Sequence, residues 1–116
     1  MAEIKNVIKK SIHGQYLILW IDEAIANEVV ESLRQAVMNA FDEGYDKIVL
    51  EMNSVNFIES KGLEVILDLI EESQKRGAAL KIANPSHICE DIFRTTRLAT
   101  QLDIYSDIES AKRSFI

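Results

Sequence analysis

The chain has 116 residues, of which 47% are hydrophobic and 28% are charged, and its formal net charge is -6. This length and balance predict a single globular domain over residues 1–116, and an acidic chain without clustered lysine and arginine is not expected to bind nucleic acid. The lone Cys89 excludes an intrachain disulfide and a four-thiolate metal site, while the lack of a bilayer-length apolar run or a secretory leader predicts a cytoplasmic protein without membrane insertion.

The N-terminal part of the sequence predicts a β-hairpin followed by a long helix. The first strand carries apolar residues at Ile4, Val7, Ile8 and Ile12. His13-Gly14 supplies a tight turn to the second strand, the apolar run 16–21. The helix has apolar residues every four positions, at Ile25, Val29, Leu33, Val37 and Phe41, and Gly44 is expected to end it.

The apolar run 48–52 is typical of a central strand, and the clearest helix of the chain follows it. Its stripe has helical spacing at Leu63, Ile66, Leu67 and Ile70, and it ends at Gly77. After a strand at 78–83, Asn84-Pro85-Ser86 caps a helix that should bury Ile88, Ile92 and Phe93. Residues 104–105 form a last short strand, and Asp107 caps a terminal helix.

Helix-length connections between successive strands require parallel pairing through right-handed crossovers. The predicted fold class is therefore α/β. It has a mixed, mostly parallel sheet with an N-terminal hairpin, and the helices pack on the sheet.

The turn before the helix that carries Leu63 has two interpretations. Ser60 precedes the apolar stripe, so its hydroxyl is expected to serve as the helix N-cap. The same position would also suit a phosphate on Ser60, because helix N-termini stabilise anions and Lys61 could pair with it. Gly62 lowers helix propensity, which indicates close approach of a neighbour, either this chain's own sheet or a partner.

Enzyme signals are weak. His13 and His87 have no metal-ligand spacing, and no glycine-rich phosphate loop is present. The acidic pairs Glu71-Glu72 and Glu90-Asp91 diverge on helices and do not converge as an acid and a base. The sequence predicts a protein that is not an enzyme and that has no cofactor and no metal site.

Residues 48–63 resemble the signature of the STAS domain family, specifically its bacterial anti-sigma factor antagonists. In those proteins a strand ending in Asp-Leu-Ser leads to Phe-Ile-Asp-Ser-Ser-Gly-Leu. Asn84-Pro85-Ser86, Thr96-Arg97-Leu98 and Ile104-Tyr105 are also similar to that family, which has Thr-Gly-Leu where this chain has Thr96-Arg97-Leu98.

The resemblance implies a regulatory protein-binding module. Antagonists of this type bind an anti-sigma factor, often a serine kinase of the histidine-kinase-like ATPase type, and phosphorylation of the second serine of the pair ends that binding. Here the family aspartate corresponds to Glu59, the first serine to Ser60, and the acceptor to Lys61. Lysine offers no hydroxyl, so three outcomes stay open: Ser60 takes the phosphate, the protein is always active, or the domain has another STAS role.

The expected partner surface comprises Phe57, Ile58, Glu59, Ser60, Lys61, Gly62 and Leu63, with Asp22 and Glu23 placed nearby by the family's element order. For Asp22 and Glu23, favourable interaction with a helix dipole is the preferred explanation. Two other functions remain as alternatives: a STAS subunit of a transport or signalling assembly, and a small-molecule or nucleotide binder.

Overall fold

The computed structural model describes residues 7–115. Its elements are β1 (Ile8–His13), β2 (Tyr16–Ile21), α1 (Glu28–Asp42), β3 (Lys47–Glu51), α2 (Ser60–Lys75), β4 (Ala79–Ala83), α3 (His87–Thr95), the 3-10 helix η1 (Leu98–Thr100), β5 (Ile104–Tyr105) and α4 (Ile108–Arg113). The predicted order of strands and helices is confirmed, with η1 as an addition. Ile4, which the sequence assigned to the first strand, lies outside the described residues.

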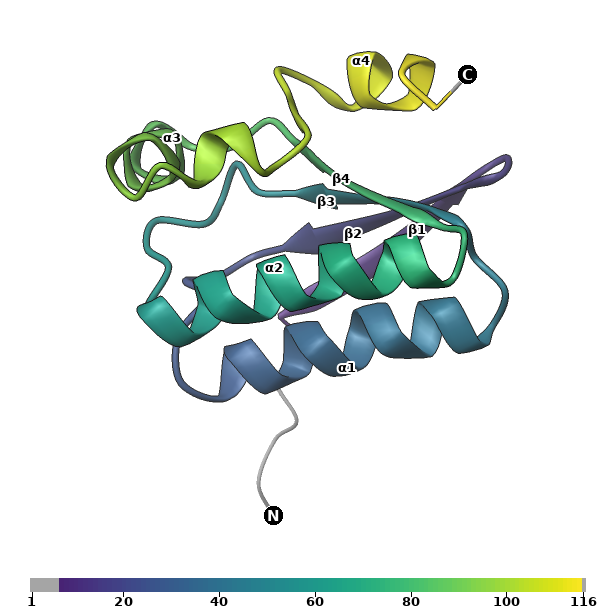
Figure 1. Ribbon diagram of the computed structural model, residues 1–116, viewed down its shortest axis with the longest axis horizontal. Helices are drawn as coiled ribbons and strands as arrows, with labels where there is room; N and C mark the ends of the chain where they lie inside the picture. Colours follow the sequence, from purple (N-terminus) through teal and green to yellow (C-terminus); the bar gives the residue numbers. More distant parts are fainter. Residues whose placement is uncertain (1–6, 116) are drawn as a thin grey trace.

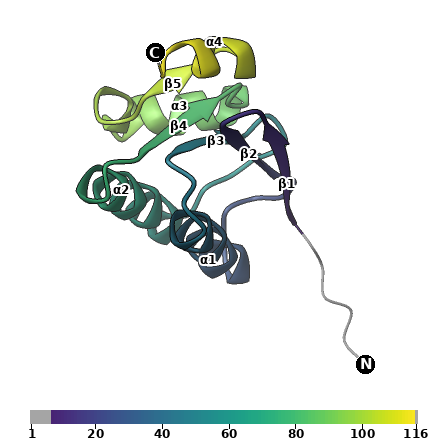
Figure 2. The ribbon, with the colours of Figure 1, turned by 90° about the vertical axis from the view of Figure 1, so that its right-hand side faces the viewer.

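The strands form one mixed sheet in the order β1-β2-β3-β4-β5. β1 pairs with β2 antiparallel, and every later neighbour is parallel. Helices α1 and α2 lie side by side on one face of this sheet, and α4 lies on the other (Figure 1). The same two-sided arrangement is visible from the side in Figure 2, which confirms the α/β fold class.

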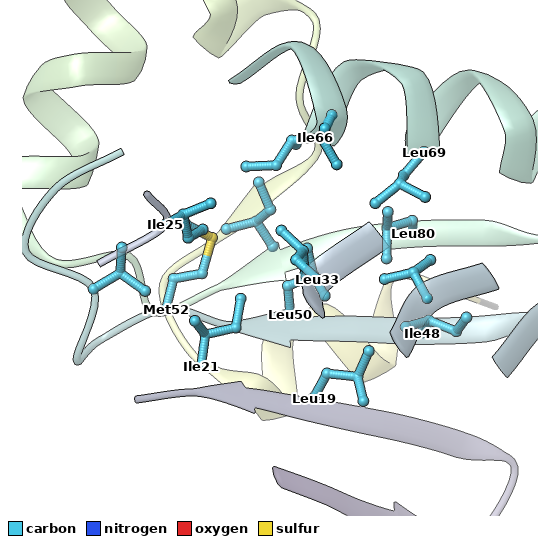
Figure 3. Packing of buried hydrophobic residues seen from close by; sticks show 14 of the residues in the cluster. Leu19, Ile21, Ile25, Leu33, Ile48, Leu50, Met52, Ile66, Leu69 and Leu80 are labelled. Carbon is cyan, nitrogen blue, oxygen red and sulfur yellow. The ribbon is translucent and has the colours of Figure 1, made fainter. Parts of the chain in front are cut away.

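The main core lies between the sheet and the helices α1 and α2. Figure 3 shows Leu19 and Leu50 pointing from the strands toward Leu33 of α1 and Ile66 of α2, and all four are at most 2% exposed. The intervening strand residues point to the opposite face, where Ile18, Val49 and Ala83 pack with Ala111 of α4. The strands therefore contribute apolar side chains to the buried layers on both faces of the sheet, because successive side chains point to opposite faces.

The long N-terminal helix begins later than its apolar stripe predicts. Ile25 was assigned to the helix, but α1 begins at Glu28, and Ile25 forms an isolated parallel bridge with Ile58. The side chain of Ile25 is fully buried, so it continues the apolar pattern. Its backbone, however, is hydrogen-bonded to the segment before α2, which prevents helical geometry at this position.

The predicted helix caps in the C-terminal half are confirmed, whereas one residue predicted to be buried is exposed. The Ser86 side chain accepts a hydrogen bond from the Cys89 N–H, and Asp107 accepts one from Ser110. Ile88 was predicted to be buried, but half of its surface is exposed, because α3 turns Cys89 and Phe93 inward instead.

Within residues 7–115, no helix has both the length and the apolar character needed to cross a bilayer.

Candidate protein-docking surface

The turn that enters α2, residues 57–63, is held against the segment that follows β2. The Ile25 N–H donates to the Phe57 carbonyl at 2.9 Å, and the Glu59 N–H donates to the Ile25 carbonyl at 3.0 Å. These two bonds form the bridge between Ile25 and Ile58. They bring the chain just after Asp22 and Glu23 beside the α2 entry turn, although no sequence motif links the two segments.

Bonds from the sheet and from α3 hold the loop that precedes this turn. The buried Glu51 carboxylate, at the end of β3, accepts from the Asn53 N–H at 2.9 Å and from the Asn84 amide at 2.8 Å. The Val55 carbonyl accepts from the Ser86 hydroxyl and the Cys89 thiol of α3. The loop is therefore bonded at both of its sides, which limits its freedom and fixes where the α2 entry turn emerges.

Ser60 is not the N-cap of α2, so that prediction is wrong. Ser60 is the first helical residue, and Glu59 is the N-cap, in extended geometry and without a side-chain capping bond. The reason is that the Glu59 carbonyl accepts from the Leu63 N–H at 3.1 Å, so the first turn of α2 closes on Glu59 and the helix begins one residue earlier than predicted. Ser60 is exposed, and its hydroxyl makes no bond within residues 7–115.

Gly62 allows α2 to approach the bridge closely. A Cβ atom at this position would lie 2.8 Å from Ile25 Cγ2, 3.0 Å from the Ile25 carbonyl oxygen and 3.0 Å from Ile58 Cγ2. The neighbour that excludes a larger residue is therefore this chain's own bridge, and not a partner.

Replacing Gly62 by alanine is expected to lower the free energy of unfolding by up to about 2 kcal/mol, because overpacking costs roughly 1–3 kcal/mol and better helix propensity offsets ~1 kcal/mol. Urea unfolding measures this value. Ser60→Ala, in the same helical turn but exposed, is the control and should change stability by less than about 0.5 kcal/mol. A Gly62→Ala variant that is more stable than the parent protein would show that the bridge can move aside.

The α2 entry turn divides into supporting and exposed side chains. Ile58 and Gly62 are buried, so their part in any binding is to hold the turn in place. Phe57 is 51% exposed, Ser60 and Lys61 are exposed, and Glu59 and Leu63 are partly buried. An exposed phenylalanine on a rigid turn is a typical anchor for a protein partner.

The two acidic residues after β2 differ in exposure. Asp22 is exposed, and its carboxylate lies 3.3 Å from Lys9 Nζ on β1. Glu23 is partly buried. Asp22 thus already has a cationic neighbour within the chain, whereas no such pair involves Lys61 among the described residues.

Ile88 is a surface residue that the sequence did not reveal. Its neighbours Ser86 and Cys89 bond to Val55, so this exposed isoleucine emerges where α3 contacts the loop that leads to Phe57. The available signal is the spacing of Cys89 and Phe93, which lie four residues apart and form the buried stripe of α3. Ile88 precedes Cys89 by one residue and so lies beside this stripe.

Burial raises the pKa of the Cys89 thiol, which disfavours the nucleophilic thiolate. Over residues 7–115, no three histidine, cysteine or carboxylate side chains form a cluster that could hold a metal ion.

Comparison with known families identifies the fold. A model of the STAS domain matches residues 6–111. The chain belongs to the STAS domain family. This STAS domain has no match among curated protein sequences.

Solved structures with a similar fold include several anti-sigma factor antagonists. The Thermotoga maritima protein TM1081, a proposed antagonist, has a TM-score of 0.84 at 23% identity, over 92% of this chain and 92% of that chain. An antagonist from Mycobacterium paratuberculosis has a TM-score of 0.78 at 16% identity, over 92% and 91%. Unphosphorylated SpoIIAA, known from Bacillus, has a TM-score of 0.77 at 16% identity, over 93% and 95%. At these identities the likeness establishes the STAS fold.

Proposed function

We propose that this STAS domain is a regulatory, non-catalytic module that acts as an anti-sigma factor antagonist. Its partner would be an anti-sigma factor of the histidine-kinase-like ATPase type, bound through the α2 entry turn and the neighbouring exposed residues. The observation that carries the proposal is the exposed Phe57 side chain. It lies in the same turn as Ser60 and Lys61, and the backbone of this turn is held by the bridge between Ile25 and Ile58. A preformed turn lowers the ordering cost of association.

We further propose that the domain is active without a phosphorylation switch at position 61. Lys61 has no hydroxyl to accept a phosphate, and it is exposed at the second position of α2. The adjacent Ser60 is the weaker acceptor candidate, and its hydroxyl is unbonded among the described residues. Incubation with a binding kinase and ATP, followed by mass spectrometry, distinguishes an unmodified chain from one phosphorylated at Ser60.

Titration calorimetry with each purified anti-sigma factor of this class from the source organism tests the proposal. Binding by at least one of them is expected, and Glu59→Arg or Ser60→Asp should weaken it about tenfold or more while the fold persists. The Ser60→Asp variant is a clean probe, because an acidic residue in the first turn of a helix does not disfavour the helix. Unchanged affinity in both variants would show that the partner binds elsewhere.

A further inference from the structure

The part of α2 that ends at Asp68 carries three charged side chains without an ionic partner among residues 7–115. These are Lys61, Glu64 and Asp68, all exposed, which we name the unpaired charged face. The remainder of the helix differs, since Glu71 pairs with Lys75 at 3.9 Å and Glu72 pairs with Arg76 at 2.8 Å. Unpaired charge is therefore concentrated at the end of α2 that follows the exposed Phe57.

The unpaired charged face borders a shallow hollow between α1 and α2, which lie side by side (Figure 1). The hollow has a volume of about 320 Å³ and is lined by Arg34, Lys61, Glu64, Val65, Leu67 and Asp68. Arg34 does not neutralise the acidic residues, because its guanidinium is directed to Glu31 of its own helix at 3.5 Å. A partner side chain could enter here beside both signs of charge.

Lys61 is the least satisfied member of this face. A cation near a helix N-terminus lies at the positive end of the helix dipole, which is unfavourable. Glu64, three residues later, is within the range of a helical ion pair, yet no such pair forms. An acidic group from another molecule would satisfy the Lys61 ammonium and the N-terminal N–H groups of α2 at once.

We propose that this face selects the partner by charge: an acidic side chain of the anti-sigma factor contacts Lys61, and basic side chains contact Glu64 and Asp68. The inference rests on the proposed function and specifies the chemistry of its partner. Complementary charges speed encounter and fix the register of a complex, while like charges oppose it. Along about two helical turns, the cation Lys61 is followed by the anions Glu64 and Asp68. This asymmetric order of charges defines a single docking orientation.

Charge reversal tests the proposal by calorimetry against the purified anti-sigma factor that binds the parent domain. Lys61→Glu should weaken binding at least tenfold, and the double variant Glu64→Lys with Asp68→Lys should do the same. High salt should weaken binding of the parent domain but narrow the difference between it and the variants. An acidic-to-basic change in the partner at the site that faces Lys61 should restore binding of Lys61→Glu.

Matched controls separate a local contact from net charge. Lys75→Glu makes the same charge change as Lys61→Glu near the other end of α2, and Glu109→Lys places a charge reversal on α4. Both should bind like the parent. If Lys61→Glu and Lys75→Glu bind equally, the charge proposal is overturned while the antagonist function stands. If no anti-sigma factor of this class binds the parent domain, both proposals are overturned.

Discussion

Replacing Glu51 by alanine is expected to lower the free energy of unfolding by about 3 kcal/mol or more, because each hydrogen bond to a charged group contributes roughly 1.5–3 kcal/mol and two are lost. Both carboxylate oxygens are used: one accepts from the Asn53 N–H and the other from the Asn84 side chain. Glu51 itself is only 6% exposed. Its removal would leave two donors without an acceptor in a site with little access to water.

The same change should loosen the loop that leads to Phe57. Asn53 follows Met52 at the start of this loop, and its N–H is bonded to Glu51 at the end of β3. Amide hydrogen exchange at Asn53 should therefore accelerate more than exchange in the strand core, and affinity for an anti-sigma factor should fall because the turn is less preorganised. A variant in which stability falls but exchange at Asn53 is unchanged would contradict this role.

Glu51→Gln provides the matched control. Glutamine keeps the shape of the side chain but has one acceptor oxygen in place of two, so it cannot satisfy both donors as they stand. Rotation of the Asn84 amide would let the two amides pair, which predicts a smaller loss, about 1 kcal/mol. If Glu51→Gln lowers the free energy of unfolding as much as Glu51→Ala does, the rotation of the Asn84 amide does not occur.

Local signals predicted the order of strands and helices along the chain well, because strand length, apolar spacing and glycine stops act over a few residues. Gly44 and Gly77 both have positive φ just after their helices, as expected of helix stops. Arg97 also has a positive φ of 63°, at the position where the family has glycine. The arginine side chain gives no warning of that conformation, and it was not predicted from the sequence.

Contacts between distant segments were the part that sequence reasoning could not reach. Ile25 has the spacing of a helical residue, and only its bonds to Phe57 and Glu59 show that it belongs to a bridge. That one bridge explains why Gly62 is small, and the bond from the Leu63 N–H to the Glu59 carbonyl explains why Ser60 is not the cap. The candidate site itself was visible because residues 57–63 are contiguous, whereas Ile88 and Glu51 act on it from other parts of the chain.

Replacing Lys81 by methionine is expected to lower the free energy of unfolding by about 2–3 kcal/mol, because Ser114 loses two hydrogen bonds from a charged, nearly buried donor. Lys81 lies on β4 beneath α4 and is only 9% exposed. Its ammonium donates to the Ser114 hydroxyl at 2.7 Å and to the Ser114 carbonyl at 3.2 Å. It also lies 3.2 Å from the Asp103 carboxylate and 4.5 Å from the centre of the Phe115 ring.

These contacts make Lys81 the polar attachment of the C-terminal helix. α4 has six residues, too few to be stable alone, so it depends on what holds it to the sheet. The ammonium also satisfies a carbonyl at the C-terminal end of α4, where a cation is favourable. Loss of the ammonium should therefore release α4 first, and hydrogen exchange in α4 should accelerate while exchange in β2 and β3 follows global stability.

The choice of methionine separates charge from packing. Methionine retains an unbranched apolar chain beneath Phe115, so the loss of stability in Lys81→Met measures the contribution of the ammonium group. Lys81→Ala also removes side-chain packing and should lower the free energy of unfolding by about 1 kcal/mol more. Lys75→Met, on the exposed side of α2, is the control and should change stability by less than about 0.5 kcal/mol. If Lys81→Met were as stable as the parent protein, the cost of desolvating the ammonium would equal what its bonds contribute, and apolar contacts from Ile108, Ala111 and Phe115 would suffice to hold α4 on the sheet.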